Sequence, residues 1–197
     1  MKRLFVHLFK GAETHTMRRL IYFFSLLPIL FIAGWLKEPV QPEEQLSQTD
    51  GPYIIYRKDT IFIHSVYEGG TLRKLRTDTS FTAAKKEIRL TVPTGNPHEF
   101  FTVNLKARLS QEKTEFRKVP RQLAISDMEG DLKGFLRLLK GNKVIDQQLN
   151  WTFGDGHLVL TGDFFDRGKQ VTELLWFIYS LKKKAKEAGG YVHFILG

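Results

Sequence analysis

Residues 157–168 read His-Leu-Val-Leu-Thr-Gly-Asp-Phe-Phe-Asp-Arg-Gly, a short apolar strand followed at once by an acidic loop between two glycines. The same pattern occurs earlier, where a short strand expected at residues 123–126, Leu-Ala-Ile-Ser, precedes Asp-Met-Glu-Gly-Asp at 127–131. A third apolar strand is expected at residues 191–196. Segments of helical period separate these strands, and this alternation is typical of βαβ units with a parallel sheet. The sequence therefore predicts an α/β domain over residues 119–197.

Two helices are expected between the three strands. The first spans about residues 132–140 and the second about residues 171–188, because apolar side chains recur in each at helical spacing. Lysines crowd the last turns of the second helix, where they suit the negative end of the helix dipole, and we interpret them as a solvated helix end. The strand at residues 191–196 is apolar enough to be central in a sheet covered on both faces.

The acidic residues follow the strands at the sheet edge where ligands gather. In open parallel sheets this is the edge beyond the carboxyl ends of the strands. Asp127, Glu129 and Asp163 all fall there. Carboxylate oxygens suit hard divalent cations, and a pair of cations needs a bridging carboxylate, for which Asp163 is the natural candidate. Arg167 would bind phosphate oxygens through its planar guanidinium.

Simpler structural roles exist for the same residues. Asp127 or Asp131 could cap the helix that follows them. Asp166 and Arg167 could form a surface ion pair that contributes little to stability. The functional interpretation depends on the combination of two acidic loops at equivalent strand ends with an arginine behind the second.

Composition narrows the chemistry further. The 197 residues contain no cysteine, so any bound metal must use oxygen or imidazole ligands. His193 lies mid-strand and is expected to be a core residue, whereas His157 begins its strand at the opposite edge and is not expected to be a ligand. The formal net charge is +9, but the basic residues are scattered among acidic ones, so no nucleic-acid partner is expected.

From about residue 122 to residue 197 the chain resembles the calcineurin-like metallophosphoesterase family, in its phosphoprotein-phosphatase-like branch. The motifs of that family run Asp-x-His, Gly-Asp-x-x-Asp-Arg-Gly and Gly-Asn-His-Asp/Glu, and residues 162–168 match the second in full. The resemblance implies the front part of a fold with two sheets flanked by helices. It also implies hydrolysis of phosphate esters with two divalent ions, drawn from Mn, Fe, Zn and Mg.

The resemblance assigns a role to each candidate residue. It implies that Asp127 binds the first metal and that Asp163 bridges both. Asp166 would orient the catalytic histidine of the third motif, and Arg167 would hold the substrate phosphate. Glu129 stands where the family usually has histidine, and a glutamate ligand favours harder ions such as Mn²⁺ or Mg²⁺ over Zn²⁺, with Mn²⁺ the first choice.

The third motif is represented by Gly197 alone. We therefore expect an amino-terminal fragment with an incomplete second metal site and weak or no activity. The intact protein would act on a phosphoprotein, a nucleotide or a small phosphate ester. The rival hypothesis is a non-catalytic exported protein whose β region binds a partner.

Residues 20–36 form an almost wholly apolar run that follows Arg18 and Arg19. Its length is at the lower limit of about 17 to 25 residues for a membrane span, so residues 1–36 are predicted to be a signal peptide or a membrane anchor. The preceding positive charges place the rest of the chain outside the cytoplasm, on the periplasmic or extracellular face, or secreted if the segment is cleaved. No small-x-small cleavage site is evident, which favours an anchor. Either Met1 or Met17 could be the start.

Between this run and the α/β domain the sequence predicts two further regions. Residues 37–50 are rich in proline and glutamate and are interpreted as a linker. Residues 51–118 show the two-residue period of half-buried antiparallel strands and are expected to form a small β-rich region. Glu68-Gly69-Gly70 is a plausible hairpin turn, and residues 93–97 join the next two strands.

Overall fold

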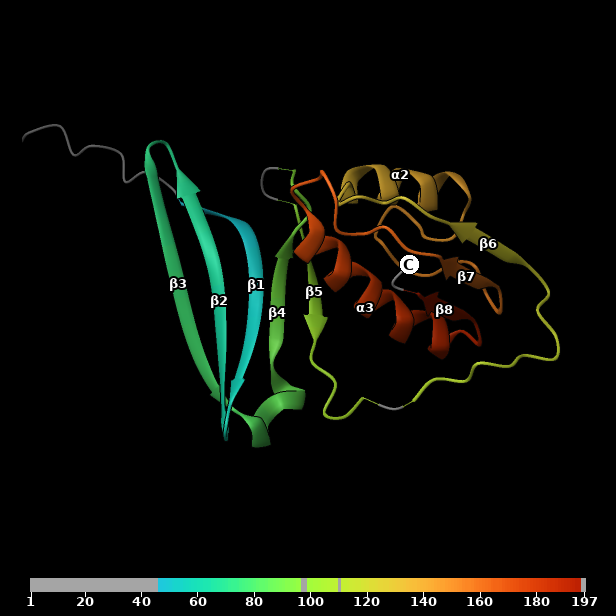
Figure 1. The fold of residues 1–197 in the computed structure, drawn as a ribbon, viewed down its shortest axis with the longest axis horizontal. Coiled ribbons are helices and arrows are strands. Elements are labelled where there is room, and N and C mark those ends of the chain that lie inside the picture. The colour runs from blue at the N-terminus through green and yellow to red at the C-terminus, as the bar shows by residue number, and fades with distance from the viewer. Residues whose placement is uncertain (1–45, 97–98, 110, 196–197) are drawn as a thin grey trace, which may run out of the picture. The chain divides into compact units, whose positions relative to one another are not determined.

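The computed structural model describes residues 46–96, 99–109 and 111–195. These residues lie in one compact unit, Gln45–Gly197. Figure 1 shows two antiparallel groups of strands, one long helix beside them, and a small parallel sheet beyond that helix.

The first sheet is an antiparallel meander of β1 (Ser47–Arg57), β2 (Thr60–Gly69) and β3 (Leu72–Phe81). The predicted hairpin turn is confirmed, with Gly69 opposite Leu72. The prediction that the linker extends to residue 50 is wrong, because Ser47 already pairs with Glu68. Gln48 is buried, and its Nε2 donates a hydrogen bond to the Thr91 carbonyl over 3.2 Å. The polar side chain suggested a solvated linker, but its hydrogen-bond partner lies far away in the sequence.

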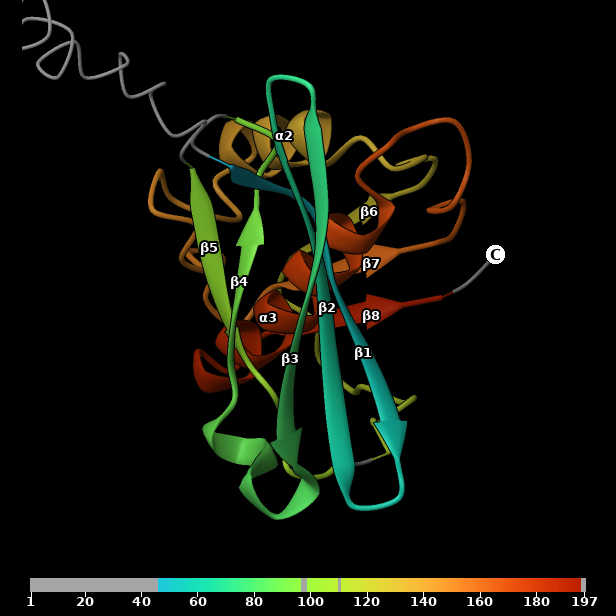
Figure 2. The same ribbon diagram turned by 90° about the vertical axis from the view of Figure 1, so that its left-hand side faces the viewer.

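The second sheet is a hairpin of β4 (Arg89–Pro93) and β5 (Phe100–Asn104), joined to β3 by the short helix η1 (Thr82–Glu87). Its alternating apolar side chains point into the core, as the two-residue period predicts. Figure 2 shows this hairpin beside β1 to β3 with the long helix behind it.

The third sheet is parallel and has the order β6 (Gln122–Ile125), β7 (His157–Leu160), β8 (Tyr191–Phe194). The three predicted strands are therefore present in the expected parallel arrangement. The expectation that residues 191–196 form a central strand is not met among the described residues, because β7 is central and β8 lies at the edge. Only Val192 of β8 is buried, and its other side chains are half-buried.

The two predicted helices are α2 (Leu132–Gly141) and α3 (Val171–Glu187). Helix α3 contacts β8 on one side and β1, β4 and β5 on the other. One hydrophobic core extends from Ile61 of β2 to Val192 of β8. The expected boundary between residues 118 and 119 therefore does not separate two compact units.

No helix in the described part of the chain is long and apolar enough to cross a bilayer. The apolar run at residues 20–36 lies outside the described residues, as does Gly197. The signal or anchor therefore stays a prediction.

Candidate metal centre

The two acidic loops lie side by side because they follow neighbouring parallel strands. Asp127 comes two residues after β6, and Asp163 comes three residues after β7. The Asp127 amide donates to the Gly162 carbonyl over 3.2 Å, and the Glu129 amide donates to the Asp163 carbonyl over 2.9 Å. The backbone of each loop therefore positions the other.

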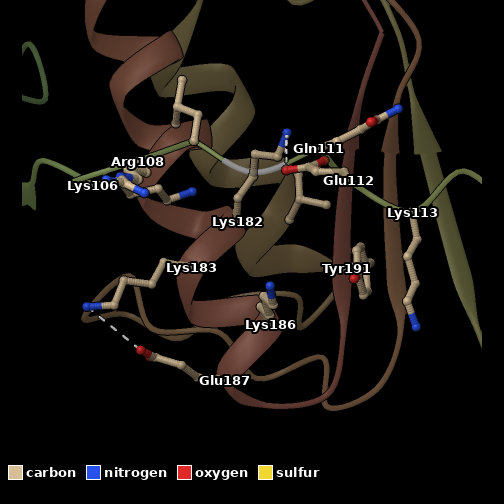
Figure 3. A pocket seen from close by; sticks show the side chains of 12 residues that line it. Lys106, Arg108, Gln111, Glu112, Lys113, Lys182, Lys183, Lys186, Glu187 and Tyr191 are labelled. Atoms are coloured by element: carbon tan, nitrogen blue, oxygen red, sulfur yellow. Dashed lines mark ion pairs between the residues drawn. The ribbon is translucent and has the colours of Figure 1, made fainter.

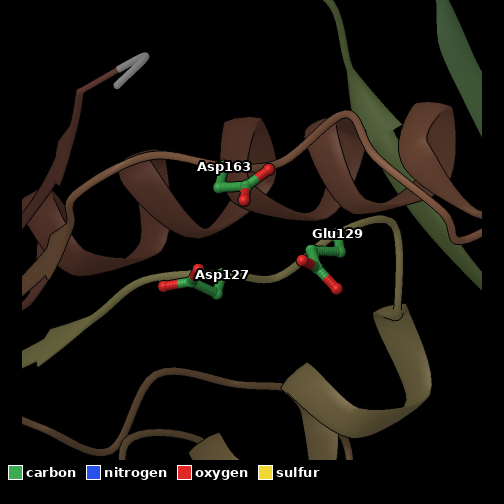
Figure 4. A group of neighbouring side chains, drawn as sticks. All are labelled: Asp127, Glu129 and Asp163. Atoms are coloured by element: carbon green, nitrogen blue, oxygen red, sulfur yellow. The ribbon is translucent and has the colours of Figure 1, made fainter.

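The carboxylates of Asp127, Glu129 and Asp163 converge. One oxygen from each lies within 4.8 Å of the others, and Figure 4 shows the three side chains grouped between the loops. Glu129 is half-buried and the two aspartates are exposed. This all-oxygen set fits a hard divalent cation such as Mn²⁺ or Mg²⁺.

The backbone of these loops is strained at the residues that carry the charges. Asp127, Glu129, Asp163 and Arg167 have φ values of 58°, 46°, 54° and 54°. Side chains other than glycine rarely adopt this left-handed region, and such conformations cluster at functional sites. Four of the seven described non-glycine residues with positive φ therefore lie in these two loops.

Two glycines allow the loops to touch. The Gly168 amide donates to the Glu129 carbonyl over 2.7 Å, and a Cβ added to Gly168 would lie 2.2 Å from that oxygen. A Cβ on Gly130 would lie 2.9 Å from the Gly168 carbonyl carbon. Only glycine therefore permits this close backbone contact at either position.

Arg167 is exposed, with 71% of its side chain accessible, and it joins the second loop to the acidic cluster. Its Nη2 pairs with Glu129 Oε1, and its Nε lies 3.4 Å from Asp166 Oδ2. The backbone amide of Arg167 also donates to Asp166 Oδ1 over 2.8 Å. The ion pair anticipated between Asp166 and Arg167 is present, but the guanidinium also reaches a candidate metal ligand.

The capping alternative is resolved for one aspartate. Asp131 is the N-cap of α2, where its Oδ1 accepts a hydrogen bond from the Gly134 amide over 2.8 Å. Asp127 takes no part in this cap, and its carboxylate lies in the acidic cluster instead.

Two polar residues with structural roles near the second loop were not anticipated from the sequence. The side chain of Gln170 donates from Nε2 to the Thr94 carbonyl over 2.9 Å, and its backbone N–H donates to the Gly130 carbonyl over 3.1 Å. It therefore ties the loop to the β4–β5 hairpin and to the first acidic loop. No local pattern marks a glutamine for this role.

Glu173, in the first turn of α3, is the second unanticipated residue and is only 2% exposed. Its Oε1 accepts a hydrogen bond from the Gly51 amide over 3.2 Å, whereas Oε2 has no partner among the described residues. Burial, with a smaller contribution from Asp50, raises the pKa of Glu173 to about 7. The sequence signal for a buried position at residue 173 was its spacing of four residues from Phe177, which is also buried.

The two strand histidines lie on neighbouring strands, His157 at the first residue of β7 and His193 at the third residue of β8. His193 Nε2 is 2.9 Å from His157 Nδ1, and the Phe116 ring packs edge-on against both. His157 is buried and His193 half-buried. Burial, together with the neighbouring His157, lowers the pKa of His193. Neither histidine belongs to the described acidic cluster, and the expectation that neither binds metal stays a prediction.

Comparison with known proteins finds that part of this chain is similar to phosphatases. No family model matches the chain. Shewanella-like protein phosphatase 2 of Arabidopsis thaliana is 38% identical over 80 residues, which cover 41% of this chain and 20% of the relative. Shewanella-like protein phosphatase 1 of Plasmodium berghei is 33% identical over 75 residues, or 38% of this chain and 21% of the relative. These matches point to the calcineurin-like metallophosphoesterase family.

A solved structure supports the same relationship. The cold-active protein-tyrosine phosphatase of a psychrophilic Shewanella species superimposes with a TM-score of 0.58 at 33% sequence identity. The match covers 75% of this chain and 42% of that one. Because the match covers more of the chain than residues 119–197, the mixed α/β fold shared with this phosphatase includes part of the β-rich region. The chain spans about a fifth of the length of the two curated relatives.

Proposed function

We propose that this chain contributes the front half of a metal-dependent phosphatase site and that the protein hydrolyses phosphate esters. The observation that carries the proposal is the convergence of Asp127, Glu129 and Asp163 with Arg167 on two interlocked loops. The phosphatase relatives support the same reaction class.

Each residue then has a distinct task. Asp127, Glu129 and Asp163 would hold divalent metal, with Asp163 as the bridge if two ions bind. A bound divalent ion supplies Lewis-acid activation of the phosphoryl group and of water. The Arg167 guanidinium would break its ion pair with Glu129 and bind the phosphate oxygens, because its planar group of N–H donors suits a tetrahedral anion. Asp166 would restrain Arg167 and orient a histidine supplied by the third motif.

Two features of this proposal determine which metal and which substrates to test first. Glu129 replaces the nitrogen ligand usual for the family, so Mn²⁺ or Mg²⁺ is favoured over Zn²⁺. The names of the relatives make phosphoproteins, phosphotyrosine included, the first substrates to test, ahead of nucleotides and small phosphate esters.

Residues 1–36 would export or anchor the protein, with the metal centre outside the cytoplasm, and protease accessibility on intact cells tests that placement.

The direct test of phosphate recognition uses inorganic phosphate, the product of every such reaction, titrated calorimetrically into the Mn²⁺-loaded chain. Arg167→Gln is expected to weaken phosphate binding at least about tenfold, since it removes a charge-assisted bidentate contact. Arg73→Gln on β3 is the matched control and is expected to leave the affinity unchanged. Equal phosphate affinity in wild type and Arg167→Gln would contradict the role proposed for Arg167.

Turnover is the second test. The 197-residue chain is expected to hydrolyse a generic aryl phosphate weakly or not at all with Mn²⁺, because the proton donor of the third motif is not among its residues. Extension of the chain through a Gly-Asn-His-Asp/Glu sequence is expected to restore activity. Efficient turnover by the 197-residue chain, lost on Asp163→Asn, would show that the fragment interpretation is wrong.

One observation favours the rival function, a non-catalytic partner-binding protein. The β1–β3 sheet exposes large apolar side chains, namely Tyr53, Ile55, Tyr56, Leu72, Leu75 and Phe81. Such a surface is typical of an interaction site. Failure of the chain to bind Mn²⁺, together with inactivity of the extended protein, would favour this second function.

A further inference from the structure

A pocket of about 510 Å³ lies at the end of the parallel sheet remote from the acidic loops. It is a partly open hollow lined by the connection that follows β5, the second half of α3 and the start of β8 (Figure 3). Six cationic side chains and two carboxylates line it. The cations are Lys106, Arg108, Lys113, Lys182, Lys183 and Lys186, and the carboxylates are Glu112 and Glu187.

The two carboxylates neutralise only part of this charge. Glu112 pairs with Lys182 over 2.9 Å, and Glu187 lies 3.8 Å from Lys183. No ion pair is found for the other four cations within the described ranges. The pocket therefore carries a substantial excess of positive charge.

Lys106 shows that this excess is partly withdrawn from water. Its side chain is half-buried, with Nζ 4.7 Å from the centre of the Tyr179 ring. Its backbone amide donates to the Tyr179 hydroxyl over 2.7 Å, which fixes this point of the pocket wall. Burial, and then the positive charges of Lys182, Lys186 and Lys183, lower the pKa of Lys106. Cations that repel one another here would be stabilised by an anion.

The helix dipole does not explain the whole cluster. Lysines at the end of α3 suit its negative carboxyl terminus. Lys106, Arg108 and Lys113, however, lie in the connection after β5, so the dipole of α3 does not explain their position. Two segments far apart in sequence therefore contribute cations to one cavity, whose volume lies in the range of about 300 to 1,000 Å³ that is usual for small-ligand sites.

We propose that this pocket binds a small soluble anion that carries several phosphate groups, such as tripolyphosphate or the phosphate chain of a nucleotide. Several unpaired cations in one cavity suit a multiply charged ligand better than a single phosphate. Leu109, Tyr191 and Val192 provide an apolar wall for whatever the phosphate chain carries. This site is separate from the acidic cluster, and its occupancy requires no divalent metal.

The test is calorimetric titration of the 197-residue chain with tripolyphosphate in metal-free buffer at constant ionic strength. The double variant Lys182→Gln, Lys186→Gln is expected to weaken binding at least about tenfold. The matched control Lys74→Gln, Lys86→Gln makes the same charge change on exposed residues of β3 and η1 and is expected to leave the affinity unchanged. Circular dichroism verifies that both variants are folded.

A further variant separates the two anion sites. Arg167→Gln is expected to leave tripolyphosphate binding unchanged, because Arg167 belongs to the acidic loops. Loss of binding in Arg167→Gln but not in the pocket variant would overturn the proposal. Equal weakening in the pocket and control variants would also overturn it, because it would indicate a response to net charge alone. Neither result depends on whether the protein is a phosphatase.

Discussion

The two ends of the parallel sheet are built in different ways. At the carboxyl end, three acidic side chains are positioned by strained backbone, and the two loops are locked by direct contact. At the other end, the cations line a cavity from residues with ordinary backbone, since none of them is among the described residues with positive φ. Preorganised backbone is the feature expected of a metal or catalytic site, because geometry is critical there. Long flexible cations suit recognition of an anion by charge.

The largest expected effect comes from disrupting the direct backbone contact between the two acidic loops. In Gly168→Ala the new Cβ would collide with the Glu129 carbonyl, 2.2 Å away, and with Gly130. We expect a loss of about 2–4 kcal/mol in the free energy of unfolding and loss of Mn²⁺ binding. Urea denaturation and Mn²⁺ titration measure both.

Gly141→Ala is the control for this change. A Cβ at Gly141, the last residue of α2, meets nothing within 4 Å. It is expected to leave Mn²⁺ binding intact and to change stability by less than about 1 kcal/mol. If Gly168→Ala were equally harmless, contact between the loops would not be what holds the site.

The next effect concerns Glu173, in the first turn of α3, which accepts a hydrogen bond from the Gly51 amide of β1. Its pKa is about 7 in the folded protein against an ordinary value of 4.5, so the folded state favours the protonated form. Its contribution to stability is therefore complete below about pH 4.5 and is lost as pH rises through 7. The expected loss is on the order of 3 kcal/mol, because a shift of about 2.5 pKa units corresponds to 1.36 kcal/mol for each unit.

Glu173→Gln removes this ionisation while retaining similar shape. Denaturant unfolding at pH 5 and pH 8 is expected to show a smaller loss of stability with rising pH in Glu173→Gln than in wild type. Parallel pH profiles for the two proteins would mean that Glu173 does not titrate in this range. Glu187→Gln, on the exposed end of the same helix, provides a matched control.

The smallest effect is expected at the histidine pair, and its sign is opposite. The pKa of His193 is lowered from 6.5, chiefly by burial, while His157, Glu112 and Lys182 face it. The folded state therefore favours the neutral ring, and stability falls as pH drops below about 6.5. His193→Gln is expected to reduce this acid sensitivity. An unchanged profile between pH 5 and 7 would contradict this assignment.

Local patterns predicted much of the fold. Each strand and helix of the α/β part lies within two residues of its expected bounds, because short apolar runs, helical spacing and glycine ends are local signals. The convergence of Asp127, Glu129 and Asp163 also followed from a local rule about strand ends. Their left-handed backbone and the pairing of Arg167 with Glu129 did not, since they depend on contact between the loops.

Features missed from the sequence all depend on distant partners. Ser47 and Gln48 enter β1 because β2 and β4 satisfy them. Gln170 and Glu173 have partners at Thr94 and Gly51, more than 70 residues away in the chain. The pocket draws its cations from two segments that look like ordinary solvated charge when taken separately. Pairings of this kind are decided by tertiary structure, which no local period encodes.

The central claim, that Asp127, Glu129 and Asp163 form a metal site, is tested most directly by calorimetric titration of the folded chain with Mn²⁺. Wild type is expected to bind Mn²⁺, and Asp163→Asn is expected to weaken binding at least about tenfold, because it removes one of three charged ligands. Asp155→Asn, an exposed residue at the other end of β7, is expected to bind as wild type does. Undiminished Mn²⁺ affinity in a folded Asp163→Asn variant would contradict the account.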